Sequence, residues 1–188
     1  MAINYGETMT TTTLSRAVLE KYPNPVFIET GTLWGDAVQV ALDCGFNTIY
    51  TIELNPELAE NARQRFSAEI QQGRVGVLEG DSFEIFPKLV AELTEPATFW
   101  LDAHWDGGPV GRYKCPLPME LDALLVHPIR THTLLIDDRR ILGQANSNWG
   151  AGIYESEILE TIRKINPAYA ISYEPGWIPD DIIAAVVR

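Results

Sequence analysis

Short apolar runs and amphipathic stretches follow one another regularly along this chain of 188 residues. Short β-rich runs bounded by turn residues predict strands, whereas apolar residues at helical spacing predict helices. The predicted strands span residues 25–30, 47–53, 74–80, 97–102, 132–137, 168–174 and 181–188. The predicted helices span residues 14–22, 35–44, 56–66, 82–93, 118–127 and 155–165.

This order of elements predicts the fold class. Strands that alternate with helices form βαβ units, whose parallel sheet is covered on both faces. No helix separates the last two predicted strands, so we expect them to pair as a C-terminal antiparallel hairpin through residues 175–180. We therefore predict an α/β fold, a Rossmann-like, doubly wound, mostly parallel seven-stranded sheet. It forms a single domain over residues 1–188, with residues 1–13 as a flexible tail.

Local signals mark the ends of several predicted helices. One of the threonines at 10–13 is expected to cap the first helix. Gly45 stands where the C-terminal cap of the helix over 35–44 is expected, and Pro56 suits the first turn of the helix that it begins.

Composition and charge narrow the classes of partner. The chain has 26 acidic and 14 basic residues, a formal net charge of −12 that would repel a nucleic-acid backbone. No apolar run approaches the roughly 18–20 residues of a membrane helix, and the first residues lack a secretory signal pattern. Cys44 and Cys115 show neither paired nor metal-type spacing. We expect a reduced, cytoplasmic protein with neither a nucleic-acid nor a membrane partner.

Acidic residues stand at the ends of the first five predicted strands. Because ligands of an open α/β sheet bind outside the carboxyl ends of its strands, these residues are expected to share one site. They are Glu29, Glu53, Asp81, Asp102 and the pair Asp137–Asp138. This convergence is the strongest functional signal in the sequence.

The segment E-T-G-T-L-W-G-D over 29–36 follows the first predicted strand. Gly31 and Gly35 permit a tight turn before a helix N-terminus, which suits the polar tail of a ligand. Their spacing differs from the G-x-G-x-x-G of nicotinamide enzymes, and Glu29 would repel a pyrophosphate but attract an ammonium or sulfonium group. A nicotinamide dehydrogenase is therefore disfavoured, and a plain glycine turn is the other interpretation.

Two further strand ends are consistent with an adenosine ligand. Glu53 lies 22 residues after Gly31, where an acidic side chain can accept hydrogen bonds from both ribose hydroxyls. Asp81 and Ser82 can hold an adenine edge. The alternatives are that Glu53 is a solvated helix-start residue and that Asp81 and Ser82 only cap the following helix.

These motifs carry a resemblance to a known family. E-T-G-T-L-W-G resembles the E-x-G-x-x-x-G motif of class I S-adenosylmethionine-dependent methyltransferases, above all the catechol O-methyltransferase type. T-I-E-L-N-P-E is similar to that family's T-I-E-x-N-P-(D/E) ribose segment, and the resemblance covers residues 25–145. It implies S-adenosylmethionine as cofactor, with Glu29 at the methionine amino group, Glu53 at the ribose and Asp81–Ser82 at the adenine. The candidate cofactor-binding residues are Glu29, Gly31, Thr32, Gly35, Asp36, Glu53, Leu54, Asp81, Ser82, Asp102 and His104.

The resemblance also implies a cation site. W-L-D-A-H-W resembles the family's F-L-D-H-W with one residue inserted, and L-L-I-D-D resembles the segment with its Asp-Asn pair, with Asp138 in place of Asn. Carried over, Asp102, Asp137 and Asp138 would bind Mg²⁺ or another divalent cation. Three carboxylates at neighbouring strand ends repel one another without a cation. Alternatively, Asp137 and Asp138 cap a turn and Asp102 touches only the cofactor.

The chain departs from the family where the catalytic lysine is expected, because Asp106 and Gly107 stand there. His104, Lys114 and Arg139 are possible substitutes. We choose His104 as the base, with Asp102 as the second candidate catalytic residue, because imidazole titrates near neutrality. The alternatives are that His104 packs beside Trp105 or lies near the metal as a bystander.

Two loops, 103–117 and 139–153, are expected to select the substrate. Trp105 and Trp149 either form walls of its pocket or fix these loops, and residues 146–152 are expected to form a flap. The N-terminal extension is shorter than the cap that the family places over a small aromatic substrate, so a catechol is not implied. A second subunit of a homodimer would be one source of a cap.

We predict metal-assisted O-methylation of a small-molecule hydroxyl, with S-adenosylmethionine as methyl donor. Two alternatives stay open. One is a metal-independent methyltransferase that acts on N, C or O with His104 as base, and the other is a non-catalytic S-adenosylmethionine-binding module.

Overall fold

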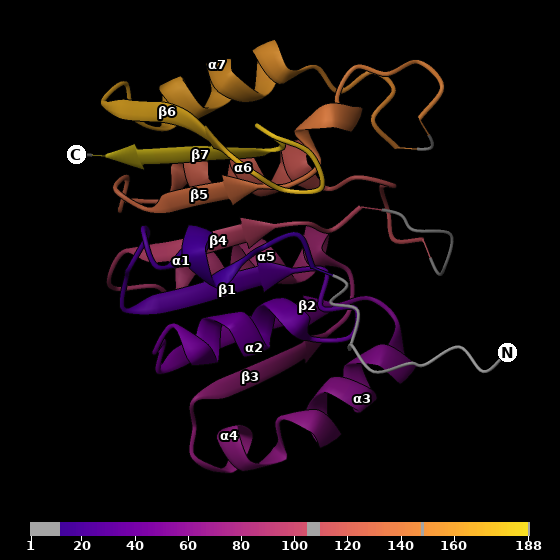
Figure 1. Cartoon of the computed structure of the whole chain (residues 1–188), viewed down its shortest axis with the longest axis vertical. Coiled ribbons are helices and arrows are strands. Elements are labelled where there is room, and N and C mark those ends of the chain that lie inside the picture. The colour runs from indigo at the N-terminus through magenta and orange to yellow at the C-terminus, as the bar shows by residue number, and fades with distance from the viewer. Residues whose placement is uncertain (1–11, 105–109, 148, 188) are drawn as a thin grey trace, which may run out of the picture.

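The predicted alternation of strands and helices forms a mixed β-sheet in a computed structural model that describes residues 12–104, 110–147 and 149–187. Over these residues the sheet has seven strands in the order β3-β2-β1-β4-β5-β7-β6 (Figure 1). The strands are β1 Val26–Thr30, β2 Thr48–Glu53, β3 Val75–Glu79, β4 Ala97–Leu101, β5 Thr133–Ile136, β6 Tyr169–Glu174 and β7 Ile182–Val187. The helices are α1 Arg16–Leu19, α2 Asp36–Asp43, α3 Pro56–Arg65, α4 Ser67–Gln71, α5 Ser82–Ala91, α6 Leu117–Val126 and α7 Glu155–Ile165, with a 3₁₀ turn at Arg139–Ile141.

The sheet confirms the predicted fold class. Strands β1 to β5 run parallel, whereas β7 pairs antiparallel with both β5 and β6, which gives the expected C-terminal hairpin. The strand order reverses between β1 and β4, since β1 pairs with β2 on one side and β4 on the other. Such a switch point leaves a crevice outside the carboxyl ends of the two strands, where ligands of doubly wound sheets bind.

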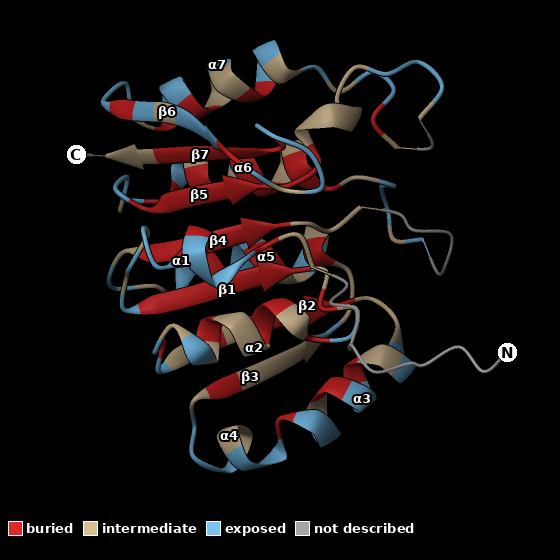
Figure 2. Ribbon diagram, in the orientation of Figure 1, coloured by how far each residue is buried: buried red, intermediate tan, exposed pale blue. Residues whose placement is uncertain are grey.

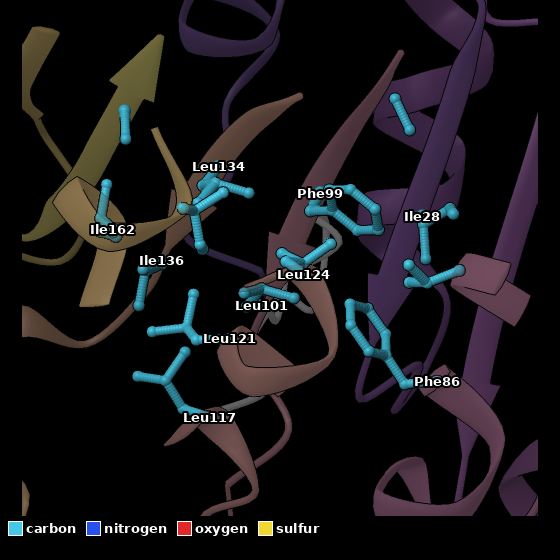
Figure 3. Packing of buried hydrophobic residues seen from close by; sticks show 14 of the residues in the cluster. Ile28, Phe86, Phe99, Leu101, Leu117, Leu121, Leu124, Leu134, Ile136 and Ile162 are labelled. Atoms are coloured by element: carbon cyan, nitrogen blue, oxygen red, sulfur yellow. The ribbon is translucent and has the colours of Figure 1, made fainter. Parts of the chain in front are cut away.

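Alternate residues of the central strands supply two separate cores. Ile28 and Phe99 face the layer of α5, α6 and α7, where they pack with Phe86 and Leu121 (Figure 3). The neighbouring residues on the strands, Phe27 and Trp100, face the layer of α1, α2 and α3. Strands β1, β4 and β5 are consequently buried over their whole length, as their continuous apolar runs require (Figure 2).

The first helix differs from its prediction. It spans Arg16–Leu19 rather than residues 14–22, and its N-cap is Ser15, whose Oγ accepts a hydrogen bond from the Val18 N–H, rather than a threonine. Thr13, the last residue of the predicted tail, donates a hydrogen bond from its hydroxyl to Asp137 at the carboxyl ends of the strands, as described below. Residues 1–11 lie outside the described residues.

Other local signals agree with the observed element ends. Gly45 adopts φ +87° directly after α2, and its N–H donates to Leu42 while that of Phe46 donates to Ala41, the two bonds of a Schellman cap. Pro56 begins α3 as predicted. The short helix α4, which follows α3 after Phe66, was not predicted. Within the described ranges, no helix combines the length and the apolar character needed to cross a membrane.

Candidate cofactor and cation site

A cavity of about 280 Å³ opens at the carboxyl ends of the parallel strands. Its wall includes predicted site residues from five strand ends, namely Gly31, Glu53, Leu54, Asp81, Ser82, Asp102, His104, Asp137 and Asp138. The described sheet therefore brings together most of the residues that the sequence nominates. Glu29, Thr32, Gly35 and Asp36 are not among the residues that line this cavity.

The turn after β1 depends on backbone conformations with positive φ. Gly31, Leu33 and Gly35 have φ values of +87°, +49° and +81°. A Cβ atom on Gly31 would lie 2.7 Å from the backbone oxygen of Asp102, so only glycine lets β1 and β4 approach so closely at this point. The unusual conformation of Leu33 directs its N–H to Glu53 Oε2, at 2.8 Å. The glycine turn therefore contacts the ends of both neighbouring strands, β4 through Gly31 and β2 through Leu33.

Glu29 supports this turn from within the protein. Its side chain is buried, and its Oε2 accepts a hydrogen bond of 2.7 Å from the Thr51 hydroxyl, which in turn shares a hydrogen bond with Thr32. Burial raises the pKa of Glu29 well above its ordinary value, and the Thr51 hydrogen bond counteracts this only in part. Glu29 is not among the residues that line the cavity, and its contact with the cofactor's amino group stays a prediction.

Glu53 ends β2 and lines the cavity. Its Oε1 and Oε2 accept hydrogen bonds of 2.8 Å from the N–H groups of Asn55 and Leu33. Two backbone donors thus fix the carboxylate at the cavity wall. Each carboxylate oxygen has two lone pairs and can accept more than one hydrogen bond.

Asp81 caps α5 and also lines the cavity. Its Oδ1 accepts a 3.0 Å hydrogen bond from the Phe83 N–H, as expected of an N-cap, and its Oδ2 accepts one from the Arg112 N–H. The Arg112 guanidinium lies 4.7 Å from the centre of the Phe83 ring, and Tyr113 meets the same ring edge-on. Asp81 and Phe83 therefore hold part of the predicted functional loop 103–117 against the cavity.

His104 lies between two of the predicted cation ligands. Its Nδ1 is 3.1 Å from Asp102 Oδ1 and its Nε2 is 3.2 Å from Asp138 Oδ2. Trp149 stacks on the imidazole with ring centres 4.5 Å apart. Burial opposes a charged imidazolium, but the hydrogen bond and charge of Asp102 and the charge of Asp138 outweigh it, so the pKa of His104 is raised.

One buried carboxylate oxygen of Asp137 has no hydrogen-bond partner among the described residues. Its Oδ2 accepts a 2.6 Å hydrogen bond from the Thr13 hydroxyl, whereas its buried Oδ1 has no hydrogen-bond partner among the described residues. Burial, followed by the charges of Asp102 and Asp138, raises the pKa of Asp137 to about 8. An orphaned buried carboxylate oxygen beside two further carboxylates is the donor chemistry that suits a divalent cation.

Several residues of the site were missed by sequence reasoning. Arg140 forms ion pairs with both Asp138 and Asp181, which joins the end of β5 to the start of β7. Thr13 and Trp177 also line the cavity. The R-R pair directly after L-L-I-D-D was the available signal for Arg140, but the pattern does not tell which acidic residue it meets. Nothing in the local pattern marked Thr13 or Trp177.

Lys114 and Arg139, the other candidate substitutes for the lysine of the resembling family, differ in their surroundings. Lys114 lines the cavity, whereas Arg139 pairs with Glu155 at 3.0 Å and packs 4.3 Å from the centre of the Tyr173 ring. Trp105, Asp106 and Gly107 lie outside the described residues, as does residue 148 of the predicted flap.

Comparison with known proteins places this arrangement in a structural class. No family model and no curated protein sequence matches the chain. Among solved structures, an SAH-bound methyltransferase from Podospora anserina superposes with a TM-score of 0.61 at 14% identity, covering 92% of this chain and 76% of the other. An O-methyltransferase from Bacillus cereus in complex with SAH gives 0.61 at 17% identity, covering 92% and 78%. The O-methyltransferase TomG from Streptomyces achromogenes, in complex with SAM, gives 0.58 at 16% identity, covering 92% and 77%.

The chain therefore shares its fold with solved methyltransferases that contain SAM or SAH. The resemblance found in the strand-end motifs is therefore confirmed at the level of the fold.

Proposed function

We propose that this chain is an S-adenosylmethionine-dependent methyltransferase that transfers a methyl group to a hydroxyl of a small molecule. The observation that carries the proposal is the convergence of Gly31, Glu53, Asp81 and Asp102 on one cavity at the switch point of the sheet. Each residue belongs to a different strand end. The similar structures that contain SAM or SAH support the same cofactor here.

The cavity offers complementary groups along the length of such a cofactor. Glu53 supplies carboxylate oxygens for the ribose hydroxyls, and Asp81 and Ser82 lie at the wall proposed for the adenine. The turn at Gly31 leaves room for the amino-acid end. The carboxylate of Asp102 at the cavity wall favours a positively charged sulfonium, since opposite charges attract most strongly where water is excluded.

The transfer reaction sets the remaining requirements. An acceptor oxygen attacks the methyl carbon in line with the carbon–sulfur bond, whose electron pair leaves with the sulfur as a neutral thioether. The acceptor must therefore be positioned and must lose its proton. Asp102, Asp137 and Asp138 would hold a divalent cation, whose chemistry is to lower the pKa of a bound hydroxyl. His104 lies at the same wall, where its imidazole can take the proton of the acceptor.

Calorimetry with S-adenosylhomocysteine tests the cofactor assignment. We expect saturable one-site binding, and at least tenfold weaker binding by the Glu53→Gln variant, which removes the negative charge at the ribose position. Glu79→Gln is the matched control, because Glu79 pairs with Glu53 across β2 and β3 but is exposed and does not line the cavity. Absence of binding, both with and without Mg²⁺, would refute the proposal.

The position of His104 favours a second candidate, a metal-independent methyltransferase in which the imidazole alone accepts the proton. The two are separated by methyl transfer to a panel of hydroxylated acceptors in the presence of a chelator. Loss of turnover that a divalent cation restores supports the metal-assisted reaction. Undiminished turnover supports the second candidate.

A further inference from the structure

Three potential cation ligands converge at the edge of the cavity, and one of them is a nitrogen. One atom each from Asp102, His104 and Asp138 lie within 4.8 Å of one another. Asp102 Oδ1 lies 3.1 Å from His104 Nδ1, which is similar to the spacing of about 3 Å between adjacent ligands around an octahedral ion bound at about 2.1 Å. Asp138 Oδ2 faces the other ring nitrogen, Nε2, at 3.2 Å. The three residues are therefore close enough for one atom of each to reach a common ion.

The chain around His104 holds its ring in this position. The His104 N–H donates a 3.0 Å hydrogen bond to the carbonyl of Asp102, so the backbone turns back on itself immediately after β4. Trp149 packs on the face of the imidazole with 25° between the ring planes. A ligand whose orientation is fixed in advance loses less entropy when the ion binds.

The backbone conformation and ion pairs of Asp138 fix the orientation of its carboxylate. It adopts φ +59°, a conformation that aspartate tolerates better than most residues, and its Oδ1 is paired with Arg140. Its Oδ2 is thereby left facing His104. Arg140 is itself held by Asp181, so the carboxylate has the supporting partners that metal ligands characteristically have.

A separate observation points to a missing positive charge at the same place. Asp137 Oδ1 is buried without a hydrogen-bond partner in the described part of the chain, in a residue that is only 6% exposed. A ligand oxygen of Asp137 also lies within 4.8 Å of one from Asp138. This orphaned oxygen is not explained by the ion pairs of Arg140 or by the position of His104.

We infer that His104 is a direct ligand of the cation, together with Asp102 and Asp138, and that the site prefers a first-row transition-metal ion such as Mn²⁺, Fe²⁺ or Co²⁺ over Mg²⁺. This inference rests on the proposed function; it replaces the all-oxygen ligand set expected from the resemblance and makes His104 a ligand of the cation instead of the base. Imidazole nitrogen suits transition metals, whereas Mg²⁺ favours oxygen ligands.

Pulsed electron paramagnetic resonance of the full chain with Mn²⁺ gives a direct readout that does not depend on activity. We expect modulation of the electron spin echo by one imidazole nitrogen in the native protein and in Trp149→Phe, which retains an aromatic ring beside His104. His104→Asn should abolish this coupling. Bound Mn²⁺ without nitrogen coupling in the native protein, or no bound Mn²⁺, would overturn the inference even if the variants fail to fold.

Metal competition by calorimetry provides the second measurement. We expect His104→Asn to lower the affinity for Mn²⁺ at least tenfold while that for Mg²⁺ changes less than threefold, because asparagine offers an oxygen instead of a nitrogen. An unchanged ratio of the two affinities contradicts a ligand role. Binding of S-adenosylhomocysteine is measured separately, so that failure of the ligand assignment is distinguished from failure of the proposed function.

Discussion

Replacement of Gly31 by alanine tests whether the close approach of β1 and β4 shapes the cofactor site. Gly31 follows β1 and Gly45 follows α2, and both residues have a φ of +87°. A Cβ atom at Gly31 would lie 2.7 Å from the Asp102 backbone oxygen and 3.2 Å from the Ala103 Cα, whereas a Cβ atom at Gly45 meets nothing within 4 Å. Gly45→Ala is therefore a control that matches the backbone conformation without the steric conflict.

The two substitutions should differ in magnitude. Each alanine has a left-handed conformation that costs about 1–2 kcal/mol relative to glycine. Gly31→Ala must in addition displace the backbone at Asp102, and overpacking of this kind costs about 1–3 kcal/mol. We therefore expect Gly31→Ala to lower the free energy of unfolding by about 2–5 kcal/mol and Gly45→Ala by about 1–2 kcal/mol.

Urea unfolding at constant m-value measures this difference, and calorimetry shows whether it extends to the site. Because Asp102 is displaced only in Gly31→Ala, that variant should bind S-adenosylhomocysteine at least tenfold more weakly, whereas Gly45→Ala should bind it as the native protein does. Equal losses of stability in the two variants, with unchanged cofactor affinity in both, would refute the steric explanation.

Three further predictions concern buried polar groups. Burial, followed by the charge of His127, lowers the pKa of His132 to about 4; the unfolded state therefore takes up its proton first as the pH falls below 6.5. Relative to the His132→Gln variant, the free energy of unfolding of the native protein should therefore fall by about 3 kcal/mol between pH 6.5 and 4, and a difference that stays constant with pH would contradict this. Burial raises the pKa of Glu120 to about 8 from an unfolded value of 4.5, so stability is lost as the pH rises through that range. Glu120→Gln should therefore gain roughly 3–5 kcal/mol relative to the native protein by pH 8.5, whereas a pH-independent gain would show that Glu120 is not the titrating group. Thr13→Val leaves Asp137 without its donor and should lower stability by about 1–3 kcal/mol in urea unfolding, with Thr13→Ser near the native value; equal behaviour of the two variants would argue against this hydrogen bond.

The fold was predictable because its elements have strong and local signals. The apolar spacing of residues 155–165 gave the observed bounds of α7, whose buried residues Ile158, Ile162 and Ile165 repeat at helical intervals. Gly45 and Pro56 marked helix ends through backbone preferences that act over a few residues. Such effects need no knowledge of which elements pack together.

The site was predictable only as far as strand ends determine it. Parallel strands bring their carboxyl ends to one edge, so Glu53, Asp81 and Asp102 converge regardless of the details of the loops. Glu29 stands near the end of β1 but lies two residues after Phe27, which places both side chains on the same face of the strand. Side-chain alternation therefore buries Glu29, although it stands at a strand end.

The remaining contacts depend on long-range packing that a local pattern does not contain. Thr13 meets Asp137 across 124 positions of sequence, and Arg140 meets Asp181 across 41. The placement of His104 between two carboxylates combines a turn after β4 with a loop tryptophan from residues 139–153. Each contact arises from the docking of separate elements, so it is visible only once the sheet is assembled.

The most direct test of the central claim is a crystal structure of the chain grown with saturating S-adenosylhomocysteine. We expect electron density for the ligand in the cavity at the ends of β1, β2 and β4, with the ribose hydroxyls on Glu53 and the sulfur on the side of Asp102 and His104. A cavity without ligand density at saturation, or a ligand bound away from Glu53, would contradict it.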